Sequence, residues 1–122
     1  MEFSCTARRS GGLLVLEVAG DIDLAVHGRF QAAIDELWPT GPIDVVVDCS
    51  RVTFLDSMGL RVLVHAMQRA AGHGCGFALA APSQPVLRVL DLAGVKSLFS
   101  VIGPLPDADA EPAAEAAPDP AI

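Results

Sequence analysis

Hydrophobic and polar residues follow two different periods along this chain, and these periods predict a regular succession of strands and helices. Five segments have the alternating or continuous apolar pattern of strands: 3–9, 13–20, 43–49, 77–81 and 97–102. The first two are separated by two glycines at 11 and 12, which accept the positive φ angles of a tight turn. The sequence therefore predicts an N-terminal β-hairpin.

Apolar residues recur every three or four positions in three other segments, 24–38, 57–71 and 83–94, which predicts amphipathic helices. We expect Leu24 and Phe30 to lie on the buried stripe of the first helix. Asp23 stands where a carboxylate would accept the first free backbone N–H groups of that helix. In the third helix, Pro85 suits the first turn and Gly94 suits the end.

The predicted order ββαβαβαβ is typical of an α/β domain with a mixed, mostly parallel sheet, an N-terminal hairpin and covering helices. A chain of 122 residues fits one such domain, which we expect to span residues 1–102. Polar sites in these sheets form at the carboxyl ends of the strands. If the second and third strands are parallel neighbours, Asp21, Asp23 and Ser57 share one face.

Charge is distributed unevenly between the predicted domain and the end of the chain. The net charge of −7 divides into −5 for the last sixteen residues, which hold five acids and no Lys or Arg, and −2 for the rest, which holds ten acids and eight bases. The segment 103–122 is rich in Pro and Ala and has few large apolar side chains, so we expect an acidic, disordered tail. The bases are dispersed, which argues against nucleic-acid binding.

The remaining composition points to a cytoplasmic protein without a metal or cofactor. Cys5, Cys49 and Cys75 lie far apart in apolar segments, without a CxxC pair or a nearby ligand spacing, and are expected to be buried, reduced thiols. No apolar run approaches the roughly 18 residues of a membrane span. The early Glu2 and Glu17 are poorly compatible with a signal peptide.

Ser57 follows a predicted strand, stands beside Asp56 and opens a helix, so three roles are open to it. As an N-cap it would bond backbone N–H groups two or three residues on and stabilise the helix by about 1 kcal/mol. As a nucleophile it would need a base and an oxyanion hole. Yet His65 is roughly 12 Å away along the helix, and His27 lies in what looks like an ordinary exposed helix start. As a modification site it could take a phosphate without disturbing the fold, since helix N-termini favour anions.

The stretch "VVVDCSRVTFLDSMGLRVLV", with "GDIDL" before it and "VLRVLDLAGVKSLFSV" after it, resembles the STAS domain family of bacterial anti-sigma factor antagonists. The shared features are an acid at a strand end, a short loop, and Asp-Ser-x-Gly-Leu opening a helix. Asp21 replaces the family's usual Glu. The resemblance covers residues 3–102.

The resemblance implies a regulatory protein and not an enzyme. An unmodified antagonist would bind an anti-sigma factor that is also a serine kinase, and phosphorylation of Ser57 would end binding until a phosphatase restores the serine. It places Asp23 and Asp56 near the kinase's nucleotide, with helix capping as the other role open to Asp23. Met58 is an exposed candidate contact and Leu60 a core residue. Gly59 would allow close approach or simply form a tight turn.

Two features qualify the resemblance. The family usually closes with another helix, where this chain has its acidic tail. Related STAS proteins also serve as subunits of lipid or anion transport systems, or as scaffolds in stress signalling, and often lack a phosphorylatable serine. The serine at position 57 favours the antagonist over these alternatives.

Overall fold

A computed structural model of the chain describes residues 2–38 and 43–105. In chain order the elements are β1 (Ser4–Ser10), β2 (Leu13–Ile22), the 3-10 helix η1 (Leu24–Val26), α1 (His27–Asp35), β3 (Asp44–Leu55), α2 (Ser57–Gly72), β4 (Phe77–Ala80), α3 (Gln84–Ala93), the 3-10 helix η2 (Lys96–Leu98) and β5 (Ser100–Ile102). The predicted alternation of strands and helices is confirmed. The predicted tail lies outside the described residues, apart from 103–105.

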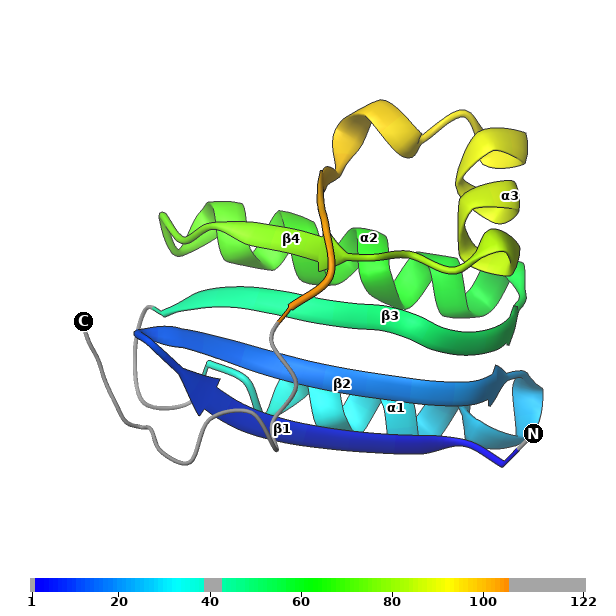
Figure 1. Cartoon of the computed structure of the whole chain (residues 1–122), viewed down its shortest axis with the longest axis horizontal. Coiled ribbons are helices and arrows are strands. Elements are labelled where there is room, and N and C mark those ends of the chain that lie inside the picture. Colours follow the sequence, from blue (N-terminus) through cyan, green and yellow to red (C-terminus); the bar gives the residue numbers. More distant parts are fainter. Residues whose placement is uncertain (1, 39–42, 106–122) are drawn as a thin grey trace.

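The strands form one mixed sheet in the order β1-β2-β3-β4-β5. β1 and β2 are the antiparallel hairpin predicted from the glycine turn, and the remaining pairs β2–β3, β3–β4 and β4–β5 are parallel. Helices α1 and α2 lie together behind the sheet, while α3 stands at the end where β3 finishes (Figure 1). The predicted α/β class and sheet type are therefore confirmed.

β2 and β3 are the parallel neighbours that position the candidate site. Ile22 at the end of β2 is in register with Leu55 at the end of β3. Because parallel strands point the same way, the segments that follow both strands emerge at the same edge of the sheet. The expected clustering of Asp21, Asp23 and Ser57 at one end of the domain follows from this register.

β3 is longer than the sequence pattern predicted. The predicted strand 43–49 and the predicted helix 57–71 leave residues 50–56 as a loop, but the strand continues to Leu55. The extension pairs with the last residues of β2 after two register shifts, between Glu17 and Ala19 and between Gly20 and Asp21. It also buries Val52 and Leu55 at 2% and 3% exposure. A strand that gains both ladder hydrogen bonds and buried apolar area is more stable than a solvated loop.

The core is built between the sheet and the helices. Its largest fully buried side chains include Phe30 of α1, Leu16 of β2 and Leu63 of α2. Leu24 was expected in the same buried stripe, and that prediction is wrong, because Leu24 is 80% exposed. The chain forms a 3-10 turn at residues 24–26 before the α-helix begins, so the helical phase of Phe30 does not extend back to Leu24.

The expectation of buried thiols holds for Cys49 but not for Cys5 and Cys75, which are half-buried. Cys5, Cys49 and Cys75 are all free, and Cys49 is fully buried. Burial raises the pKa of the Cys49 thiol to about 12 and that of Cys5 to about 11. In the part of the chain that the structure describes, no helix is long and apolar enough to cross a bilayer.

Candidate functional site

The edge formed by the ends of β2 and β3 carries a polar pair that joins the two strands. The Thr53 hydroxyl of β3 donates a hydrogen bond of 2.5 Å to Oδ1 of Asp21 on β2. This bond is the main reason that the pKa of the Asp21 carboxyl is lowered. Asp21 is thus an ionised side chain at the sheet edge, held by its neighbour strand.

Asp23 caps the turn that leads into α1, as predicted. Its side chain accepts a 3.0 Å hydrogen bond from the backbone N–H of Ala25, and its own backbone is extended. The turn it caps is the short 3-10 helix η1, which is followed directly by His27 at the start of α1. Asp23 therefore sets the direction in which α1 leaves the sheet.

The residue that caps α2 is Asp56, so the prediction of Ser57 as N-cap is wrong. The Asp56 carboxylate accepts a 2.8 Å hydrogen bond from the N–H of Gly59, and its backbone is extended, with φ −96° and ψ 177°. Its carbonyl accepts the first helical bond, from the N–H of Leu60. Ser57 is already the first helical residue. It is exposed, and within the described residues its hydroxyl makes no hydrogen bond.

His27 is the residue of this site that sequence reasoning missed. Its Nε2 lies 2.9 Å from Oδ1 and 3.2 Å from Oδ2 of Asp56. Partial burial raises the pKa of Asp56, but hydrogen bonds from Gly59 N–H and His27, with a weaker one from Met58, outweigh it, so the pKa is lowered. Asp56 is therefore an anion that is bonded to the starts of both α1 and α2.

The neighbours of Ser57 on α2 face different environments. Met58 is 47% exposed, as expected for a contact residue, and Leu60 is 7% exposed, as expected for the core. Gly59 is buried, and a Cβ there would lie 2.6 Å from Cδ1 of Leu55 and 2.9 Å from Cγ2 of Ile22. The small size of Gly59 lets α2 approach the ends of β2 and β3 closely.

Three exposed apolar side chains lie at the edge formed by the ends of β2 and β3 and the start of α2. We call this edge, which carries Ser57, the serine edge, and the three side chains the apolar rim. They are Leu24 of η1, Phe54 of β3 and Met58 of α2, with exposed fractions of 80%, 47% and 47%. Leu24 is two residues after the end of β2, Phe54 is the last but one residue of β3, and Met58 is the second residue of α2. Only Met58 was predicted as a contact. Exposed apolar groups gathered around polar ones are a common feature of protein interfaces.

A groove of about 430 Å³ lies between α1 and α2 beside the rim. It is lined by His27, Gly28, Gln31, Met58, Arg61, Val62 and His65. No Asp or Glu of the described residues lines it, and three of its residues, His27, Arg61 and His65, are basic. The groove opens next to the serine edge, since Met58 belongs to both features.

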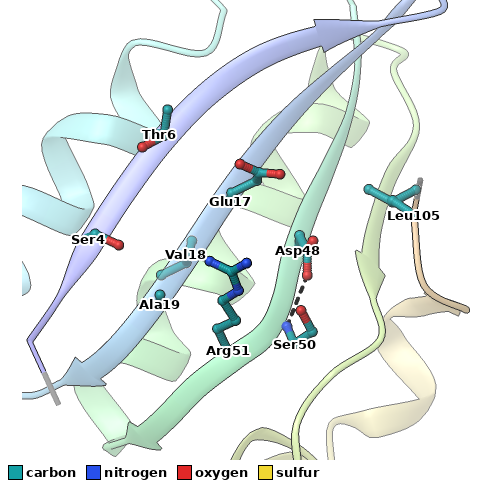
Figure 2. A pocket seen from close by; sticks show the side chains of 9 residues that line it. All are labelled: Ser4, Thr6, Glu17, Val18, Ala19, Asp48, Ser50, Arg51 and Leu105. Atoms are coloured by element: carbon teal, nitrogen blue, oxygen red, sulfur yellow. Dashed lines mark hydrogen bonds between the residues drawn. The ribbon is translucent and has the colours of Figure 1, made fainter. Parts of the chain in front are cut away.

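A second hollow, of about 290 Å³, lies over the strands β1, β2 and β3, away from α1 and α2 (Figure 2). Thr6, Glu17 and Arg51 line it, with Leu105 at one side. Glu17 forms an ion pair with Arg8, whose Nε lies 3.1 Å from Oε2 of Glu17. Asp48 accepts a hydrogen bond of 3.0 Å from the backbone N–H of Ser50. None of the predicted site residues lies here. Among the described residues, no group of His, Cys, Asp and Glu is placed to hold a metal ion.

Comparison with known proteins gives concordant matches. A family model described as "Mlab, STAS domain" matches residues 5–102. The anti-sigma-F factor antagonist RsfB of Mycobacterium tuberculosis is 32% identical over 103 residues, which cover 84% of each chain. A crystal structure of an anti-sigma factor antagonist from Mycobacterium paratuberculosis superposes with a TM-score of 0.75 at 26% identity, covering 88% of this chain and 89% of the other.

A more distant structure shares the fold. SpoIIAA from Bacillus, described as a cell fate determinant in its phosphorylated form, superposes with a TM-score of 0.63 at 18% identity and covers 82% of this chain and 90% of its own. The match supports the fold assignment.

Proposed function

This chain belongs to the STAS domain family of anti-sigma factor antagonists, and from that premise we propose that it binds an anti-sigma factor with serine kinase activity and is released by phosphorylation of Ser57. Proteins of this family are regulators and not enzymes, so Ser57 is a substrate for modification here and not a nucleophile. The single observation that carries the proposal is the exposed Ser57 hydroxyl, which makes no hydrogen bond within the described residues, at the centre of an edge with exposed apolar groups.

The proposed reaction transfers the γ-phosphoryl group of ATP to Oγ of Ser57. A new O–P bond forms as the bond from the γ-phosphorus to the β,γ-bridging oxygen breaks, ADP leaves, and the hydroxyl proton passes to a base of the kinase. A phosphatase reverses the modification by hydrolysis, which returns the serine and releases inorganic phosphate. The free hydroxyl suits this chemistry, because no intramolecular bond to a described residue must break before it reacts.

Phosphorylation should leave the domain folded. Ser57 is the first residue of α2, where the helix dipole favours added negative charge by roughly 0.3–1 kcal/mol. Asp56 already caps the helix through its own carboxylate, so modification of Ser57 removes no capping bond. The fold of SpoIIAA, which resembles this one, occurs in a phosphorylated form.

The same charge should oppose binding. In a closed interface the phosphate would lose its hydration next to the Asp56 carboxylate, and taking an ion out of water costs several kcal/mol even where a counter-ion accompanies it. A loss of only 2–3 kcal/mol corresponds to a complex that is roughly 30- to 150-fold weaker. The proposed switch is therefore a loss of partner binding without unfolding.

The apolar rim and the acids around it define the proposed contact surface. Leu24, Phe54 and Met58 offer apolar area to a protein partner. Asp21, Asp23 and Asp56 place carboxylates at the same edge, where they would lie near the nucleotide of the kinase. Gly59 contributes by seating α2 close to the sheet.

The test is a capture experiment with three forms of the chain. Wild type, Ser57→Ala and Ser57→Asp are used as baits in a native lysate, and the captured kinase is purified for titrations with and without ATP. We expect wild type and Ser57→Ala to bind, ATP to release only wild type, and mass analysis to place one phosphoryl group on Ser57.

Two outcomes would contradict the proposal. One is a Ser57→Asp protein that binds the kinase as tightly as wild type, and the other is full phosphorylation of Ser57→Ala. Recovery of the chain with membranes instead of with a kinase would favour a subunit of a lipid or anion transport system, one of the two alternatives named above beside a stress-signalling scaffold.

A further inference from the structure

Arg61 is an exposed arginine on α2 that makes no ion pair with any described residue. The two bases nearest to it on α1 and α2 that do form ion pairs are Arg69, which pairs with Asp35 at 2.8 Å, and His27, which pairs with Asp56 at 2.9 Å. Arg61 instead borders the groove between α1 and α2. A guanidinium that borders a groove without acids among the described residues, next to a modifiable serine, is available for an anion that arrives later.

The spacing on α2 brings Arg61 over Ser57. Residues four positions apart lie on the same helix face, with Cβ atoms roughly 5–6 Å apart. Long side chains in helices lean toward the N-terminus, so the patch that Arg61 covers lies over the preceding turn, which holds Ser57. An acid at the first position and a base at the second is also the more favourable orientation of such a pair.

Asp56, the acid next to Ser57 in the chain, does not form an ion pair with Arg61. Asp56 is held by the N–H of Gly59 at 2.8 Å and by His27 at 2.9 Å, so its carboxylate is already paired. The groove next to Arg61 is lined by His27 and His65 and, within residues 2–38 and 43–105, by no carboxylate. Among the described residues that line the groove, Arg61 therefore has no carboxylate that would compete with an incoming anion.

We propose that Arg61 is the intramolecular counter-ion of phosphorylated Ser57. This inference rests on the proposed function, which makes Ser57 the phosphorylated residue. The guanidinium donates two parallel hydrogen bonds to phosphate oxygens, a geometry that Arg provides and Lys does not. Arg61 thereby holds the phosphate against α2, favours its dianionic form, and competes with a phosphatase for it.

The test uses phosphoserine placed at position 57 by genetic-code expansion, so that it does not depend on finding the kinase. The ³¹P resonance of the phosphoprotein is titrated between pH 4 and 8 for wild type, Arg61→Gln and Arg61→Lys. Arg9→Gln is the matched control, because Arg9 lies far from Ser57. On β1 it is in register with Leu14 near the start of β2, and Leu14 is roughly 25 Å along that strand from Ile22 at its end. Each variant keeps its phosphoserine, so only the counter-ion changes.

We expect the ³¹P titration midpoint to rise by roughly 0.2–0.4 pH unit in Arg61→Gln, the shift for an exposed pair at this spacing. Arg61→Lys should recover part of the shift, and Arg9→Gln should match wild type. Dephosphorylation by a broad-specificity phosphatase should be faster for Arg61→Gln than for wild type. A midpoint that is identical in wild type and Arg61→Gln would overturn the inference.

The proposed function fails on a different result. If phosphoserine at position 57 leaves kinase binding unchanged, the switch is wrong, while the ³¹P midpoints still report whether Arg61 contacts the phosphate. The two ideas are thus separated by a binding measurement and a titration on the same protein.

Discussion

His27 Nε2 lies 2.9 Å from Oδ1 of Asp56, and this contact joins the first turn of α1 to the residue that caps α2. The two helices leave the sheet from neighbouring parallel strands, β2 and β3. One carboxylate therefore aligns both helix starts around Ser57. The alignment of the proposed binding edge depends on this pair.

Removing the pair should destabilise the domain in a non-additive way. Asp56→Ala loses the cap of α2 and should lower the free energy of unfolding by about 1–2 kcal/mol. His27→Gln should lose less, because the partly exposed pair is worth roughly 0.2–1 kcal/mol. Urea unfolding of both single variants and the double variant measures the coupling. Strictly additive losses would show that the contact contributes nothing.

Asp56 should also make stability depend on acid pH. Its folded-state pKa is lowered, so its contribution is present at neutral pH, above the unfolded value near 4, and is lost as pH falls through the folded value. Thermal midpoints of wild type and Asp56→Asn should differ by a constant amount from pH 7 to 5 and converge below about pH 4.

A control for this pH dependence is the same comparison in the His27→Gln background, which removes the imidazole that hydrogen-bonds to Asp56. In that background too, the thermal midpoints of the proteins with Asp56 and with Asn at position 56 should converge as the pH falls. A gap between wild type and Asp56→Asn that stays constant down to pH 3 would argue against an ionised, hydrogen-bonded Asp56 in the native state.

Two helical glycines should respond in opposite ways to the same substitution. Gly59→Ala should cost about 1–3 kcal/mol of stability, because the added Cβ meets Leu55 and Ile22 at less than 3 Å. The higher helix propensity of Ala offsets up to roughly 1 kcal/mol of this loss. Gly28→Ala should stabilise it by up to about 1 kcal/mol, since no atom lies within 4 Å of a Cβ there. Chemical denaturation decides both. Equal effects would mean that α2 can move away from the sheet.

The fold was predictable because its signals are long and local. The amphipathic periods of α2 and α3 extend over enough residues to specify each helix. The glycine turn of the hairpin is short, but it lies directly between the two strands that it joins. The end of β3 was not predictable in this way. Whether residues 50–55 form a loop or a strand depends on β2, whose last residues are separated from them by the whole of α1 and pair with them only after register shifts.

The candidate site was predictable as a set of residues but not as a set of contacts. The strand ends correctly placed Asp21, Asp23 and Ser57 at one edge. The choice of Asp56 over Ser57 as cap depends on a one-residue difference in backbone conformation. His27 became part of the site only through a contact across 29 positions. Its one available signal was the predicted parallel pairing of β2 with β3.

Asp23→Ala separates capping from a direct role in the kinase complex. Loss of its bond to the Ala25 N–H should lower stability by about 1 kcal/mol or less, because the cap serves a single 3-10 turn. If Asp23 also orients the complex, the rate of Ser57 phosphorylation should fall further than the unfolded fraction explains. Rates are compared at a temperature where both proteins are folded, and equal rates there would restrict Asp23 to capping.

The apolar rim should supply affinity without supplying stability. Leu24→Ser and Met58→Ser remove side chains that are 80% and 47% exposed, so unfolding should change by less than about 0.5 kcal/mol. Binding to the kinase should weaken about tenfold or more for each, if the rim is buried in the complex. Titration calorimetry with the captured kinase measures both affinities.

Leu98→Ser is the matched control for the rim, because Leu98 is 55% exposed and lies just before β5. β5 registers through β4 with Val46, nine residues before the end of β3, so Leu98 is far from Ser57 along the sheet. It should leave affinity unchanged. Unchanged affinity in all three variants would show that the partner binds elsewhere, and equal losses in all three would indicate a general effect of surface polarity. Only weakening confined to Leu24 and Met58 places the partner on the edge around Ser57, where a phosphate could expel it.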